Sequence, residues 1–134
     1  MSKTYCNELK QPLINTSVID GKTKAYQATI DLAAQASGDT IVIAKARQGE
    51  KFVGGIITTD TSLGSSKIKI GNAADDDKYR AEAVFTAVNT PTMFGNAAAM
   101  AALEDDEEIA IAITTANLPA SGTLKISMLF AVNN

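Results

Sequence analysis

The feature that most constrains the fold of this chain is a two-residue alternation of apolar and polar side chains. It is clearest near the C-terminus, where every second residue is apolar: Leu124, Ile126, Met128, Phe130 and Val132. Successive side chains of a β-strand point to opposite faces of a sheet, so this spacing predicts a strand with one buried face. The same pattern occurs earlier at Ile109, Ile111 and Ile113.

The alternation recurs in short segments that are separated by turn residues. Strands are predicted at 26–32, 40–45, 52–59, 67–70, 79–85, 109–113 and 124–132. At 79–85 helix and strand both stay open, since Ala and Glu favour helices. Short strands joined by Gly, Asp, Ser and Asn turns are typical of a sandwich or barrel, and the sequence predicts no crossover helix for a parallel sheet. We therefore expect an all-β fold, an antiparallel β-sandwich.

Two segments interrupt the strand pattern. Gly54 and Gly55 stand inside a predicted strand, which marks either a β-bulge, the more frequent case, or a close approach of another backbone. Residues 96–103 are rich in Ala and contain no Gly, Pro or β-branched residue, so they are the best helical candidate. A helix of two turns needs tertiary contacts to persist. The sandwich should contain at most one or two short helices.

The first 25 residues differ from the rest of the chain. Residues that break regular structure, such as Pro12 and Gly21, punctuate them, and they hold at most one short strand, at 13–19. We expect residues 1–25 to form an extended N-terminal arm and residues 26–134 to form the β-sandwich domain. The arm is either a frayed end or a segment that becomes ordered only against a partner.

The residue inventory excludes several kinds of chemistry. The chain has no His, which removes the commonest general base and metal ligand, and its single Cys, Cys6, excludes a disulfide framework and a cysteine-rich zinc site. A net charge of −3 argues against a nucleic-acid interface, which needs a basic patch. The longest apolar run, 97–103, is far shorter than the about 20 residues that cross a bilayer, and no signal peptide is predicted. We predict synthesis in the cytoplasm, no enzymatic activity, no cofactor, and no nucleic-acid, membrane or small-molecule partner.

Two acidic segments, Asp75–Asp77 and Glu104–Glu108, are the remaining candidates for a site. Paired carboxylates catalyse hydrolysis in glycosidases, but such sites also present aromatic platforms, and the chain has only three Tyr and four Phe. Carboxylates also bind Ca²⁺, yet residues 75–77 lack the alternating Asp register and distal Glu of a calcium loop. Solvated loops are the simpler interpretation, so we predict no catalytic, cofactor-binding or metal-binding residue.

The order of several short motifs is the most recognisable part of the chain. The motifs are, in order, a strand and Gly turn at 43–49, a Gly-Gly strand at 52–57, a hairpin from Leu63-Gly64-Ser65 to Ile70-Gly71, an acidic loop at 75–80, and 118–123 before the last strand. In this order they resemble the tailed-bacteriophage capsid decoration (cement) protein family.

The resemblance implies a jelly-roll-like sandwich that binds the exterior of a phage head and cements or decorates the major capsid lattice. Its partners would be the major capsid protein and two further copies of itself, as a homotrimer, and the N-terminal arm would reach a capsid subunit or a neighbouring cement protein. An alternative is a head-fibre or adhesin-type module that binds a receptor or glycan. That function needs an exposed aromatic or calcium-supported loop, for which Tyr79, Phe94 and Asp75–Asp77 are the candidates.

Overall fold

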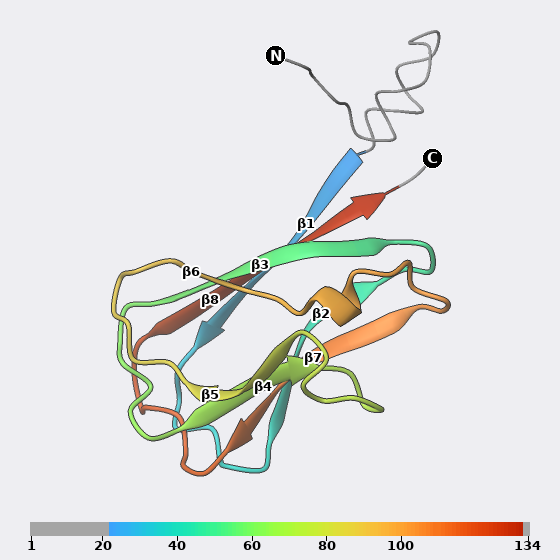
Figure 1. The fold of residues 1–134 in the computed structure, drawn as a ribbon. Coiled ribbons are helices and arrows are strands. Elements are labelled where there is room, and N and C mark those ends of the chain that lie inside the picture. The colour runs from blue at the N-terminus through green and yellow to red at the C-terminus, as the bar shows by residue number, and fades with distance from the viewer. Residues whose placement is uncertain (1–21, 133–134) are drawn as a thin grey trace, which may run out of the picture.

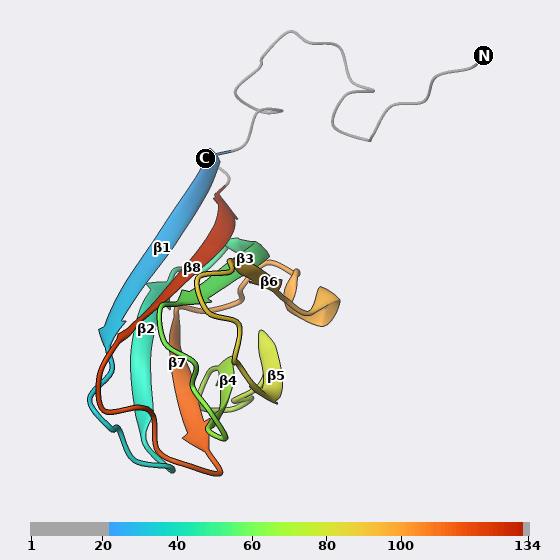
Figure 2. The same cartoon turned by 90° about the vertical axis from the view of Figure 1, so that its left-hand side faces the viewer.

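The computed structural model describes residues 22–132, which form two antiparallel four-stranded sheets packed face to face (Figure 1). The elements are β1 (Lys22–Asp31), β2 (Thr40–Ala46), β3 (Lys51–Thr59), β4 (Lys67–Gly71), β5 (Arg80–Val84), β6 (Thr92–Phe94), the 3₁₀ turn η2 (Ala97–Ala99), β7 (Glu107–Thr114) and β8 (Thr123–Val132). The first sheet has the order β1-β8-β3-β6 and the second β2-β7-β4-β5. Figure 2 shows the two layers one above the other. The predicted antiparallel sandwich is confirmed.

The core lies between the sheets and is built by the residues that alternate in the sequence. Ile109, Ile111 and Ile113 of β7 are completely buried, as are the inward residues of β8 from Leu124 to Phe130. Their neighbours along each strand face outward, which confirms the faces that the alternation predicts.

Among residues 22–132, no helix has the length and apolar character that a membrane span requires.

Three aromatic rings pack together inside the sandwich. The ring centroids of Phe52 and Tyr79 are 4.8 Å apart, those of Phe52 and Phe130 are 5.6 Å apart, and those of Tyr79 and Phe130 are 6.3 Å apart. Tilted and edge-on pairs of this kind are favourable beyond the area that they bury. These three of the chain's seven aromatic residues thus form one cluster in the core.

The structure confirms a β-bulge beside the glycine pair, but not the close approach of another backbone. The pairing of β3 with β8 shifts by one residue between Phe52 and Gly54, so Val53 forms a β-bulge. Gly55 faces the ring of Phe94, and a Cβ atom there would lie only 2.3 Å from a ring carbon. The bulge therefore precedes the pair, and the close approach is made by a side chain of β6 rather than by another backbone.

The segment between β5 and β7 differs most from expectation. Within residues 79–85, Arg80–Val84 form the strand β5, and no helix is present. Of the candidate helix at 96–103 only η2 is present, capped by the side chain of Asn96, which accepts a hydrogen bond from Ala98. Beyond η2, Ala102 forms an isolated β-bridge with Lys51 of β3. The segment is therefore helical over one turn only, because its contacts with β3 outweigh the helix propensity of Ala.

β1 begins at Lys22, which pairs with Val132 at the end of β8. Residues 22–25, assigned above to the arm, thus form the first part of this strand. The predicted short strand at 13–19 and Cys6 lie outside the described residues.

Candidate functional site

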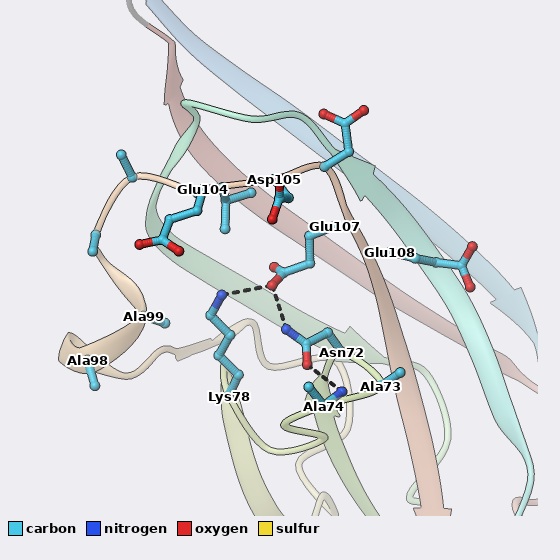
Figure 3. A pocket seen from close by; sticks show the side chains of 14 residues that line it. Asn72, Ala73, Ala74, Lys78, Ala98, Ala99, Glu104, Asp105, Glu107 and Glu108 are labelled. Carbon is cyan, nitrogen blue, oxygen red and sulfur yellow. Dashed lines mark hydrogen bonds and ion pairs between the residues drawn. The ribbon is translucent and has the colours of Figure 1, made fainter.

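The structure brings both acidic segments to one end of the sandwich. The loop after β4 and the segment before β7 enclose a groove of about 690 Å³, with η2 on its far side (Figure 3). Asn72 and Lys78 line it from the loop, and residues 104–108 line it from the other side. In Figure 3 the side chains of Lys78 and Asn72 both point toward Glu107.

Glu107 is the centre of this groove. Its Oε1 atom accepts hydrogen bonds from Asn72 Nδ2 at 2.5 Å and from Lys78 Nζ at 2.8 Å. Its Oε2 atom accepts a hydrogen bond from the hydroxyl of Tyr79. Burial alone would raise the pKa of Glu107, but the hydrogen bonds from Lys78, Tyr79 and Asn72 together hold it below its ordinary value. The carboxylate is therefore charged at neutral pH, with both oxygens engaged.

This arrangement ties two elements together and provides a hydrogen-bond donor for each oxygen of Glu107. Burial and the hydrogen bond to Glu107 raise the pKa of the Tyr79 hydroxyl far above its ordinary value, so it remains a donor. Three groups of the protein itself, Asn72, Lys78 and Tyr79, thus donate to the Glu107 carboxylate. The Glu107 cluster, defined as Asn72, Lys78, Tyr79 and Glu107, joins the start of β7 to the loop before β5.

The loop that contains Asp75–Asp77 is fixed by its own hydrogen bonds. Asn72 Oδ1 accepts from the backbone N–H groups of Ala74, at 2.9 Å, and Asp75, at 2.6 Å. Lys69 Nζ lies 2.9 Å from Asp76 Oδ2. Within the part of the chain that the structure describes, no group of three His, Cys, Asp or Glu side chains is placed to hold a metal ion.

A second buried carboxylate, Glu50, joins β1 to the turn before β3. Its Oε1 atom accepts hydrogen bonds from the Tyr26 hydroxyl at 2.5 Å and from the backbone N–H of Arg47 at 2.8 Å. Lys24 Nζ lies 3.7 Å from Oε2. Burial would raise the pKa of Glu50, but these partners lower it overall. Sequence reasoning missed this cluster, since its members are far apart in the chain and only the fold brings them together.

The aromatic residues that a glycan-binding module would need are turned inward. Tyr79 is completely buried. Phe94 is partly buried and lies against Gly55, with its ring centroid 6.4 Å from that of Phe52. Of the two aromatic candidates for the glycan-binding alternative, Tyr79 is therefore inaccessible and Phe94 is only partly exposed.

A surface that the sequence analysis did not single out lies along the outer side of β3. Residues 89–103 run beside this strand (Figure 1): the N–H of Asn89 donates to the carbonyl of Thr59, β6 pairs with residues 55–57, and Leu103 donates to the carbonyl of Glu50. Seven large apolar side chains are exposed in the described residues. Five of them belong to β3, to residues 89–103 or to the residue directly before these. We call them the apolar edge: Val53, Ile56, Val88, Met93 and Met100.

A signal for the apolar edge is present in the sequence. No charged residue occurs between Glu82 and Glu104, whereas charged residues make up 20% of the whole chain. That stretch contains Val88, Met93 and Met100. Its place on the surface follows only from the β3–β6 register, in which Met93 lies opposite Ile56.

No protein-family model and no curated protein matches the chain, but solved structures match it in fold. A chain of the cyanophage Pam1 capsid asymmetric unit has a TM-score of 0.70 at 12% identity, covering 84% of this chain and 86% of its own length. A chain of the Ralstonia phage GP4 capsid has a TM-score of 0.67 at 16% identity, covering 85% and 86%. A chain of the acidic stable capsid of Helicobacter pylori bacteriophage KHP30 has a TM-score of 0.64 at 8% identity, covering 84% and 89%.

At sequence identities this low, the comparisons carry information about the fold alone. The match extends over most of both chains in each comparison and includes both sheets of the sandwich. The chain therefore has a jelly-roll-like sandwich fold that it shares with chains in three phage capsid structures.

Proposed function

We propose that this chain is a structural protein of a phage virion, which binds the exterior of the head and cements or decorates the major capsid lattice as a homotrimer. The observation that carries the proposal is the fold, shared over most of its length with chains of three separate phage capsids. Such a protein needs one stable fold and a surface for contacts, and it needs no catalytic group.

The chemistry of the described residues agrees with a non-enzymatic protein. The two most buried carboxylates, Glu107 and Glu50, are occupied by hydrogen bonds from their own chain. The groove beside Glu107 is lined mainly by small and acidic residues, with Lys78 as its cation. The apolar edge offers a contact surface of the kind that marks a protein interface.

The arm belongs to the same proposal. Residues 1–25 would reach across to a capsid subunit or to a neighbouring copy of the chain, because an extended chain spans roughly 3.3 Å per residue. Deletion of residues 2–20 should then weaken binding to heads and lower their resistance to heat. A deletion variant that binds and protects heads as well as the full chain does would contradict this role.

Cryo-microscopy of purified virions of the phage that encodes the chain tests the whole proposal. We expect density for the sandwich on the outer surface of the head, at three-fold or quasi-three-fold positions. Absence of the chain from the particle would overturn the proposal. Density confined to fibres or tail tips would favour the adhesin-type alternative instead.

A further inference from the structure

The longest open strand edge of the sandwich belongs to β1. The two sheets end in the edge strands β1, β6, β2 and β5, and β1 is the longest of these with 10 residues. Within residues 22–132 it pairs with β8 only, and Figure 2 shows it at the margin of the molecule. A long exposed edge is a template for pairing with another strand, so folded proteins normally cover or disrupt it.

The hydrogen-bond pattern shows which residues of β1 face this open edge. In an antiparallel pair, residues that bond to the partner strand alternate with residues whose backbone groups point away from it. Leu32, directly after β1, continues the register of β1 with β8 and donates its N–H to the carbonyl of Gly122. The carbonyl of Thr123, which lies opposite Asp31, faces β3 instead, where it accepts from the N–H of Asp60. The even-numbered residues of β1 therefore bond to β8, and the open edge is formed by the exposed odd-numbered residues Thr23, Ala25, Gln27 and Thr29.

A segment of the same chain fits this edge in length and composition. Residues 13–19, which lie outside the described residues, contain no charge and are rich in Leu, Ile, Val and Thr, which suit a strand. Pro12 and the pair Asp20-Gly21 bound the segment, so it is as long as the open edge at 23–29. The chain enters the sandwich at Lys22, the first residue of β1, so every copy carries this segment within a few residues of such an edge.

The segment does not suit a tight hairpin with β1 of its own copy. A turn over residues 19–22 takes the N–H of Lys22 as its donor and pairs the two residues that flank the turn. Lys22 is an even-numbered residue, whose backbone groups point toward Val132 of β8. A wider loop would use up part of the segment, whereas the segment of a second copy can pair along its whole length.

We propose that residues 13–19 of one copy pair, as an additional strand, with the open edge of β1 in a second copy. The inference rests on the proposed role of the arm and deepens it, since it names the place that the arm reaches on a neighbouring copy. The added strand supplies hydrogen-bond partners for the odd-numbered residues of β1 and extends the sheet β1-β8-β3-β6 by one strand.

Hydrogen exchange of backbone amides, measured by nuclear magnetic resonance on the full chain, tests the pairing. In the wild-type protein, the odd-numbered amides of residues 23–29 should exchange slowly, as the even-numbered ones do through their bonds to β8. Thr16→Pro removes a donor from the segment, so it should speed exchange of the odd-numbered amides by at least about tenfold and leave the even-numbered ones unchanged. Thr4→Pro, outside the segment, is the matched control and should keep both sets slow.

Mixing two proteins shows whether the added strand comes from another copy. Isotope-labelled Thr16→Pro protein has an open edge, so an excess of unlabelled wild-type protein should slow exchange of its odd-numbered amides, and an excess of unlabelled Thr16→Pro should not. The inference is overturned by fast exchange of these amides in the wild-type protein, by an equal loss of protection in Thr4→Pro, or by a labelled edge that the wild-type protein leaves unprotected. The experiment needs no phage head, so its failure leaves the decorating role standing, whereas absence of the chain from virions overturns the proposed function even if the strands pair.

Discussion

At the scale of single residues, the fold depends on carboxylates that are buried together with their donors. Glu107, the first residue of β7, receives hydrogen bonds from Asn72, Lys78 and Tyr79, which all lie in the loop between β4 and β5. A buried charge without such partners destabilises a protein, so removal of one member of the cluster lowers the free energy of unfolding. The Glu107 cluster is therefore the most sensitive polar feature of the described residues.

Glu107→Gln should lower the free energy of unfolding by about 1–3 kcal/mol, because Lys78 and Tyr79 lose their charged acceptor. Urea denaturation measures this change. Glu108→Gln, at the exposed neighbouring position of β7, is the control and should change it by less than about 0.5 kcal/mol. Equal effects of the two substitutions would show that the cluster contributes nothing specific.

The lowered pKa of Glu107 and of Glu50 also predicts acid sensitivity. A carboxyl group with a lower pKa in the folded state stabilises the fold above its unfolded pKa, which is about 4.3 for Glu. As the pH falls below that value the unfolded chain binds protons first, so stability declines. Thermal melting between pH 7 and pH 3 should show this decline in the wild-type protein and a shallower one in Glu107→Gln. Parallel curves would contradict the prediction.

At the scale of elements, Gly55 decides whether β6 can join the sheet. The Phe94 ring occupies the space that any side chain at Gly55 would need. Gly55→Ala should therefore displace β6 and destabilise the protein by about 1–3 kcal/mol. A Cβ atom at Gly54 meets nothing within 4 Å, so Gly54→Ala is the matched control.

Denaturation midpoints of the two alanine variants test this difference directly. Gly54→Ala should be neutral or should stabilise by about 0.4–1 kcal/mol, since Ala restricts the unfolded chain. If Gly55→Ala is tolerated as well as Gly54→Ala, the close packing of Phe94 on β3 is not required for the fold.

Strands whose residues alternate between a buried and an exposed face could be predicted from the sequence. A short strand that is defined only by its pairing with a neighbour could not. The isoleucines of β7 alternate because one face of that strand is buried, so the pattern reports the structure directly. β6 has three residues and exists through its pairing with Gly55–Ile57, which leaves no periodic signal. The Ala-rich segment before β7 carries a local helical preference that its pairing with β3 outweighs.

The same distinction between sequence pattern and pairing in the fold applies to the candidate sites. The acidic run at 104–108 is visible in the sequence, but the inward turn of Glu107 toward Lys78 and Tyr79 depends on the packing of two loops. The uncharged stretch that contains Met93 is visible as well, but its position beside Ile56 depends on strand register. Sequence patterns therefore locate the residues, and only the fold shows which of them meet.

At the scale of the whole molecule, strands that are distant in the chain form the central pairs. β1 pairs with β8 along its full length, and β3 pairs with β8 across an intervening stretch that contains four other strands. Closing such long loops costs entropy before any contact is gained.

This topology predicts slow folding. Refolding from urea, followed by tyrosine fluorescence because the chain has no Trp, should take milliseconds to seconds. Addition of a prolyl isomerase separates the main phase from steps limited by proline, which take tens of seconds. A main phase completed within microseconds would contradict the prediction.

The pairing of Lys22 with Val132 also determines how the sandwich responds to mechanical load. Both ends of the described chain lie at the same end of one antiparallel ladder (Figure 2). Tension between them would act across this ladder and separate it pair by pair, starting at Lys22 and Val132, instead of shearing all its hydrogen bonds at once. A sandwich held by these two points would yield at low force, whereas one held through the outer side of β3 would keep β1 and β8 out of the path of the load.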